Sequence, residues 1–172
     1  DRSKASPSLL SLHSCCTCRA DICPLQKMRA LTKRCCCTCR APWTRPDISA
    51  ARAIRGIHSV SMTVRHPEAT GALLTQMLDA RKVGDAARTE RFAMGDGTPG
   101  RLVEVIDAGA APGALNGLGT VHHVAFAVAT PDDQLRMQRE LRTMGFHVTD
   151  VMDRQYFTSI YFREPNGVLY EI

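Results

Sequence analysis

The sequence predicts an α+β fold of two tandem β-α-β-β-β units that form a curved mixed sheet around a cavity, preceded by an irregular cysteine-rich leader. Two observations predict this fold. A pattern typical of a strand, then a helix, then three short strands, occurs twice between residues 56 and 172. In addition, all eight cysteines lie in residues 1–42 and all nine aromatic residues lie in 43–172, so two unlike segments are joined.

These patterns divide the 172 residues into five segments. We expect a leader over 1–42, a linker over 43–55, a first unit over 56–107, a connector over 108–118 and a second unit over 119–172. The leader holds 8 Lys and Arg against 2 Asp and Glu, whereas the rest holds 14 against 15. Because the positive charge is confined to the leader, we expect no nucleic-acid partner. The chain lacks an apolar run near eighteen residues, so we expect no membrane partner and a cytoplasmic protein.

The cysteines of the leader allow three interpretations. Residues 15–20 recur letter for letter at 36–41, and each copy holds a Cys-x-x-Cys pair; 17 residues separate the two pairs, a spacing that suits a four-cysteine zinc site. The stretch between them has no aromatic residue and no turn glycine, which favours a disordered leader. A disulfide scaffold would require a secretory signal, and none is convincing here. We expect the disordered leader, with the other two interpretations as alternatives.

The first unit begins with a predicted strand at 56–64, where apolar and polar residues alternate. Pro67 and Glu68 then open a helix, because proline suits the first helical turn and a carboxylate complements the helix dipole. An apolar stripe continues this helix. Three short strands are expected next, at 81–83, 89–94 and 101–106.

A glycine-rich hexapeptide lies between the last two of these strands. Residues 95–100 read Gly-Asp-Gly-Thr-Pro-Gly, a literal match to the G-x-G-x-x-G of dinucleotide-binding loops. Such a loop must open a helix whose N-terminus faces the pyrophosphate. Here the following residues have the pattern of a strand, and Pro99 fits a turn. We therefore predict a hairpin connection.

The second unit repeats this order. A strand is expected at 120–128, and Pro131 opens a helix that continues through Met144 and ends at Gly145, a residue typical of a helix C-cap. Three further strands are expected at 146–152, 155–163 and 168–172, with a turn at 164–167 between the last two.

Two polar residues on the expected strands of the second unit are candidate metal ligands. His123 lies on the first strand and Glu171 on the last, and a sheet curled around a cavity could bring both side chains inward. One imidazole and one carboxylate suit a divalent ion, and a further His would complete a two-His-one-carboxylate site. The repeat aligns Ser59 with His123 and Glu104 with Glu171. The alternative interpretation is a satisfied polar residue in a strand and a solvated Glu near the chain end.

Residues 53–172 resemble the vicinal oxygen chelate superfamily, which includes glyoxalases, bleomycin-resistance proteins and extradiol dioxygenases. Within it the chain is most similar to ring-cleaving dioxygenases of the hydroquinone type. The stretches that carry the resemblance are AIRGIHSV at 53–60, GTVHHVAF at 119–126 and DRQYFTSIYFREPNGVLYEI at 153–172.

The resemblance implies a function and a set of site residues. It implies Fe(II), with Mn(II) or another divalent metal as alternatives, held by His123 and Glu171. It implies catalytic roles for His122, Arg154 and Tyr161, since a neutral imidazole or a phenol can move a proton of the substrate and a cation can steady its anionic oxygens. The implied partners are O2 and a small aromatic substrate of the hydroquinone or catechol type. Strict strand alternation, however, would turn His122 away from the face of His123.

The chain departs from this family in its number of units. Such enzymes have four units, this chain resembles the third and fourth, and the remaining His ligand belongs to the first. The corresponding pair in the present first unit reads His58-Ser59, and serine is a poor iron ligand. We therefore expect a truncated ring-cleaving dioxygenase with an incomplete iron site. The alternatives are a glyoxalase-like metalloenzyme or small-molecule-binding protein completed by a homodimer, and a non-catalytic remnant.

Overall fold

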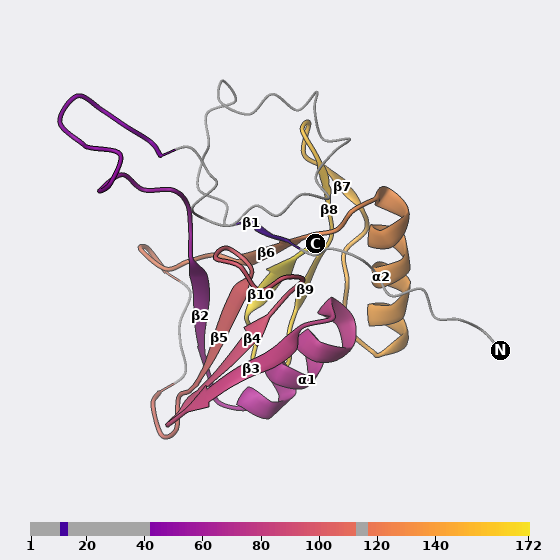
Figure 1. The fold of residues 1–172 in the computed structure, drawn as a ribbon. Coiled ribbons are helices and arrows are strands. Elements are labelled where there is room, and N and C mark those ends of the chain that lie inside the picture. Colours follow the sequence, from indigo (N-terminus) through magenta and orange to yellow (C-terminus); the bar gives the residue numbers. More distant parts are fainter. Residues whose placement is uncertain (1–10, 14–41, 113–116) are drawn as a thin grey trace.

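The computed structural model describes residues 11–13, 42–112 and 117–172, and these form the two predicted β-α-β-β-β units (Figure 1). Of the leader, only residues 11–13 are described. The zinc, disulfide and disorder interpretations concern residues that lie outside the described ones and remain predictions. In the described ranges, no helix is both long enough and apolar enough to cross a membrane.

The first unit has the predicted element order, with its own four-stranded mixed sheet. The sheet has the order β2-β5-β4-β3, in which β2 and β5 are parallel and the other neighbours are antiparallel. Residues 95–100 join two antiparallel strands, so the glycine-rich hexapeptide is a hairpin connection, as predicted. The elements are β2 (Ser59–Val64), α1 (Pro67–Leu78), β3 (Arg81–Ala86), β4 (Thr89–Ala93) and β5 (Leu102–Asp107).

The second unit forms a separate four-stranded sheet of order β1-β6-β10-β9, in which β1 (Ser11–His13) pairs antiparallel with β6. Its helix begins at Pro131 as predicted, and the hydroxyl of the N-cap Thr130 accepts a hydrogen bond from the Asp133 amide. The other elements are β6 (Val124–Ala127), α2 (Pro131–Thr143), β7 (Met152–Asp153), β8 (Thr158–Ser159), β9 (Tyr161–Arg163) and β10 (Leu169–Glu171).

Two predicted strands of the second unit are shorter than expected. In place of a strand over 146–152, the structure has only the start of β7, because side chains interrupt the ladder beside β9. The Thr149 hydroxyl accepts the Tyr161 amide at 2.9 Å, and the Thr149 carbonyl accepts the Gln138 side chain at 2.7 Å. The predicted strand over 155–163 starts late, at Thr158, after Gln155 with its left-handed φ of 68°. It is then divided at Ile160 into β8, which pairs with β7, and β9, which pairs with β10.

The two units share one hydrophobic core. Both helices and both sheets contribute buried side chains to it, and Tyr170 of the second unit is fully buried with its hydroxyl 3.5 Å from the Met62 sulfur of the first. Burial raises the pKa of Tyr170. The largest fully buried side chains are Tyr170, Phe126, Leu74, Leu78, Met94, Leu141 and Ile160.

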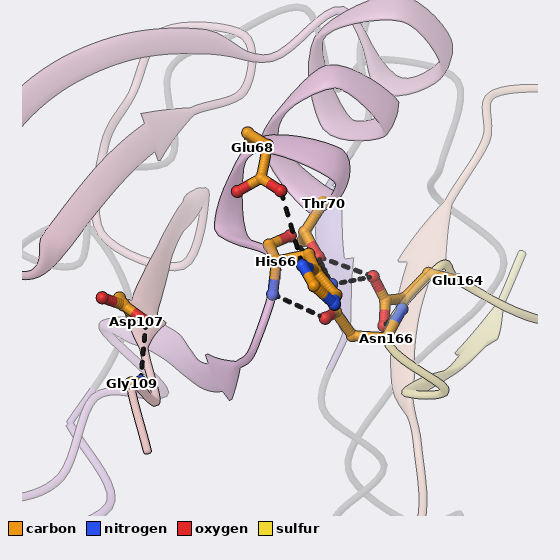
Figure 2. Close-up of polar contacts among 7 residues, drawn as sticks. All are labelled: His66, Glu68, Thr70, Asp107, Gly109, Glu164 and Asn166. Atoms are coloured by element: carbon orange, nitrogen blue, oxygen red, sulfur yellow. Dashed lines mark hydrogen bonds and ion pairs between the residues drawn. The ribbon is translucent and has the colours of Figure 1, made fainter. Parts of the chain in front are cut away.

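The start of α1 is capped by the other unit. His66 precedes α1 and makes no side-chain cap of its own. Asn166, in the turn between β9 and β10, accepts the His66 amide at 2.8 Å and donates to the His66 carbonyl at 3.0 Å (Figure 2). The turn of the second unit thus satisfies a backbone donor that every helix leaves free at its N-terminus.

Candidate metal centre

The strand register of the second unit places three residues in one row across the sheet. Ala125 of β6 lies opposite Glu171 of β10, and Glu171 lies opposite Tyr161 of β9. Residues directly opposite one another share a sheet face. His123 comes just before β6, and its contact with Glu171 places its side chain beside this row.

The side chains of His123 and Glu171 meet on this face. His123 Nε2 lies 2.7 Å from Glu171 Oε2, and the two side chains are only 15% and 8% exposed. The contact is short, but it lacks hydrogen-bond geometry, so the buried Nε2 has no hydrogen-bond partner among the described residues. A buried imidazole nitrogen without such a partner, beside a buried carboxylate oxygen, fits a pair of donors for a divalent cation.

His122 contacts His123 on the side away from the carboxylate. The Nδ1 atoms of the two imidazoles lie 2.9 Å apart, and the rings are 85° from parallel. Both histidines precede β6, which begins only at Val124, so strand alternation does not decide where the His122 side chain points. If the bridging proton resides on His123 Nδ1, its Nε2 keeps a lone pair for a cation.

Tyr161 and Arg154 continue this chain of contacts. The rings of Tyr161 and His123 have centroids 5.9 Å apart in an edge-to-face arrangement. Arg154, in the turn between β7 and β8, places Cζ 5.3 Å from the centroid of the Tyr161 ring, and its Nε lies 3.4 Å from the Ser159 hydroxyl. The structure therefore brings all five predicted residues into one continuous group. Arg154 and His122 are its exposed members.

The described residues supply two donors and not three. No group of three or more His, Cys, Asp or Glu side chains suited to a metal ion occurs among the residues that the structure describes. A complete site thus requires a donor from beyond that group of residues.

Sequence reasoning missed a residue that holds the carboxylate strand in place. Gln134 on α2 is buried, and its amide nitrogen donates to the Thr158 carbonyl at 2.9 Å and to the Ile172 carbonyl at 2.8 Å. Its amide oxygen accepts the Thr158 hydroxyl at 2.9 Å. These bonds fix the residue that follows Glu171. The signal in the sequence was an amide on the core-facing side of an amphipathic helix.

Comparison with known proteins places this chain in a family. The family model described as the Glyoxalase/Bleomycin resistance protein/Dioxygenase superfamily matches residues 56–172. The chlorohydroquinone/hydroquinone 1,2-dioxygenase of Sphingobium indicum is 35% identical over 135 residues, which cover 76% of this chain and 41% of that protein. MhqO of Bacillus subtilis, named as a candidate ring-cleaving dioxygenase, is 35% identical over 133 residues, with the same coverage of both chains. This chain thus spans about two fifths of the length of the curated relatives it matches.

Solved structures show the same fold. A candidate dioxygenase from Bacillus subtilis superposes with a TM-score of 0.70 at 30% identity, covering 77% of this chain and 43% of that chain. A candidate glyoxalase from Bacillus cereus superposes with a TM-score of 0.56 at 19% identity, covering 67% of this chain and 96% of that chain. The second likeness is one of fold alone, and it shows that a chain of about two units exists by itself in this fold.

Proposed function

The chain belongs to the Glyoxalase/Bleomycin resistance protein/Dioxygenase superfamily, and on that premise we propose that its second unit carries the metal-binding part of a ring-cleaving dioxygenase site for aromatics of the hydroquinone or catechol type. The observation that carries the proposal is the buried contact between His123 and Glu171. The names of the relatives support the reaction class, because one is a hydroquinone dioxygenase.

Fe(II) is the proposed cation, with Mn(II) or another divalent metal as alternatives. His123 would hold it through Nε2 and Glu171 through its carboxylate, a donor pair that suits these ions. When bound, the metal supplies a Lewis acid with open positions for the substrate oxygens and O2.

The remaining residues of the group act on the substrate or on the ligands. His122 holds the imidazole of His123 through the contact between their Nδ1 atoms, which fixes the ring and its tautomer. The Tyr161 hydroxyl donates a hydrogen bond or a proton to a substrate oxygen. Arg154, over the Tyr161 ring, places a positive charge where the substrate oxygens become anionic.

A third protein donor completes the proposed site. With two donors among the described residues, a second copy of the chain is the proposed source, and the metal affinity of the solution protein should then rise with protein concentration. To find this donor, the candidate histidines His13, His66 and His147 are to be replaced by alanine one at a time.

The test measures metal binding and oxygen uptake on the full chain. Equilibrium dialysis with Mn(II) and anaerobic titration with Fe(II) should show binding that His123→Ala and Glu171→Gln each abolish. His58→Ala is the matched control and should bind like the wild type. Oxygen uptake on hydroquinone that depends on Fe(II) supports the dioxygenase. Binding that survives loss of His123 contradicts the proposal, and turnover of thiol adducts with Ni(II) or Zn(II) instead would replace it with a glyoxalase-like function.

A further inference from the structure

The first unit repeats the row of residues that holds the candidate metal centre. Ser61 of β2 lies opposite Glu104 of β5, and Glu104 lies opposite Arg91 of β4. In both units the carboxylate lies on the last strand of the unit, between the first strand and a neighbouring antiparallel strand. By register, Glu104 corresponds to Glu171 and Arg91 corresponds to Tyr161.

The carboxylate of this first-unit row is fully occupied by side chains of its own unit. Arg91 donates to Glu104 Oε1 from Nε at 3.0 Å and from Nη2 at 2.6 Å. Ser61 donates to Glu104 Oε2 at 2.8 Å. The Glu104 side chain is 21% exposed, which leaves the ion pair partly sheltered from water. A guanidinium that makes two bonds to a carboxylate oxygen is a strong cationic partner.

The position of the imidazole ligand also differs between the units. By the same register, Ser59 stands in the first unit where His123 stands in the second. The Ser59 hydroxyl lies 3.2 Å from His58 Nδ1, so it has a neighbour of its own. A hydroxyl is a far weaker donor to a borderline divalent metal than an imidazole. The first unit thus keeps the carboxylate and lacks the nitrogen donor.

We propose that Arg91 is the resident cation of the first unit, whose guanidinium takes at Glu104 the place that a divalent metal takes at Glu171. The first unit then contains a second site of the kind that binds a divalent metal. The Arg91 side chain blocks this site by occupying the Glu104 carboxylate. Two replacements open it: Arg91 must leave the carboxylate, and Ser59 must become an imidazole. This inference rests on the proposed function, because the second unit defines where the metal lies.

The test opens the first unit in a chain whose second unit can no longer bind metal. In the full chain with His123→Ala and Glu171→Gln, equilibrium dialysis with Mn(II) should give no bound ion. Adding Ser59→His and Arg91→Tyr, which copies the two donors of the second unit, should restore Mn(II) binding like that of the wild type, detected by elemental analysis and by the EPR spectrum of the bound ion. Adding Glu104→Gln should remove it again. Arg91→Lys in place of Arg91→Tyr is the matched control, and it should leave the site closed because a cation stays beside Glu104.

The outcomes separate this inference from the proposed function. If the wild type binds no Mn(II), the proposed function fails and the inference fails with it. If the wild type binds Mn(II) and the opened first unit binds none, the inference is overturned. Thermal unfolding of each variant shows whether it is folded, and Arg91→Gln replaces Arg91→Tyr if the tyrosine variant is not. If the folded version of the opened first unit, with Arg91→Tyr or with Arg91→Gln, binds no Mn(II), the inference is overturned.

Discussion

Thr70 of the first unit donates a hydrogen bond of 2.6 Å from Oγ1 to Oε2 of Glu164 in the second unit, and both residues are buried (Figure 2). The other oxygen of Glu164 accepts the amides of Asn166 at 2.8 Å and Val168 at 3.0 Å. A buried carboxylate is costly unless hydrogen bonds satisfy it, and here one donor comes from a helix 94 residues away. The side chain therefore joins the two units as well as shaping its own turn.

Replacing Thr70 by valine should destabilise the chain by about 1–3 kcal/mol, because Glu164 then loses a buried charge-assisted hydrogen bond without a substitute. Urea unfolding measures the difference. Thr75→Val is the control on the same helix, since the Thr75 hydroxyl donates only to the Gly71 carbonyl of its own helix. Equal losses in the two variants would show that the bond to Glu164 does not link the units.

The ion pair of the first unit should make stability depend on pH. Hydrogen bonds from Ser61 and Arg91 hold the pKa of Glu104 below its usual value. A folded pKa below the unfolded one means that the stabilisation is fully present above the unfolded pKa and is lost as the pH falls through the folded pKa. Glu104→Gln should therefore cost about 1 kcal/mol at pH 7, and this gap should close below about pH 4. Glu140→Gln, at an exposed position of α2, is the control, and a gap for Glu104→Gln that is unchanged at acid pH would refute the expectation.

Gly71 should resist a substitution that usually stabilises a helix. A Cβ at this position of α1 would lie 2.8 Å from Cζ of Phe92, a ring that is buried in the core. Alanine gains up to about 1 kcal/mol over glycine in an open helix, whereas overpacking a core costs about 1–3 kcal/mol. We expect Gly71→Ala to lower the melting temperature. Gly84→Ala, whose Cβ would meet Arg91 Cβ at an ordinary 3.7 Å, should have little effect; a higher melting temperature for Gly71→Ala would mean that the ring moves freely.

Tyr161 and Arg154 should affect ring cleavage without affecting metal affinity. Neither side chain is a proposed ligand. The Tyr161 ring contacts the imidazole of His123, and the Arg154 guanidinium lies over the Tyr161 ring. Under conditions where the wild type takes up oxygen on hydroquinone, Tyr161→Phe should lower kcat about 10²-fold and leave Mn(II) dialysis unchanged. Arg154→Gln should raise KM as well, since it removes a charge that faces the substrate. A loss of Mn(II) binding in Tyr161→Phe would assign the phenol to the metal instead.

Much of the fold could be predicted because its signals are local. The alternation that predicts β2 and the prolines that open both helices depend on neighbouring residues only. The cap that Asn166 places on His66 spans 100 residues, and no local pattern announces it. Likewise, the strand expected over 146–152 was lost to side-chain hydrogen bonds from Thr149 and Gln138, which depend on tertiary packing.

The candidate site was predictable to a different degree. His123 and Glu171 followed from the repeat of units and from a family resemblance, and they meet because β6, which begins just after His123, pairs with β10. The alignment of Glu104 with Glu171 was also visible in the sequence. Its meaning was not, because Arg91 becomes a partner of Glu104 only through the pairing of β4 with β5.

The shared contact between Thr70 and Glu164 bears on how such a chain can be divided or recombined. A fragment that begins at residue 119 would retain His123 and Glu171, yet it would lose the helix that satisfies the turn directly after β9. Exchange of second units between homologous genes would meet the same constraint, since a donor unit arrives with a carboxylate that needs a matching hydroxyl in the recipient. A gene that acquired His123 and Glu171 in this way would not by that alone acquire their placement in the fold.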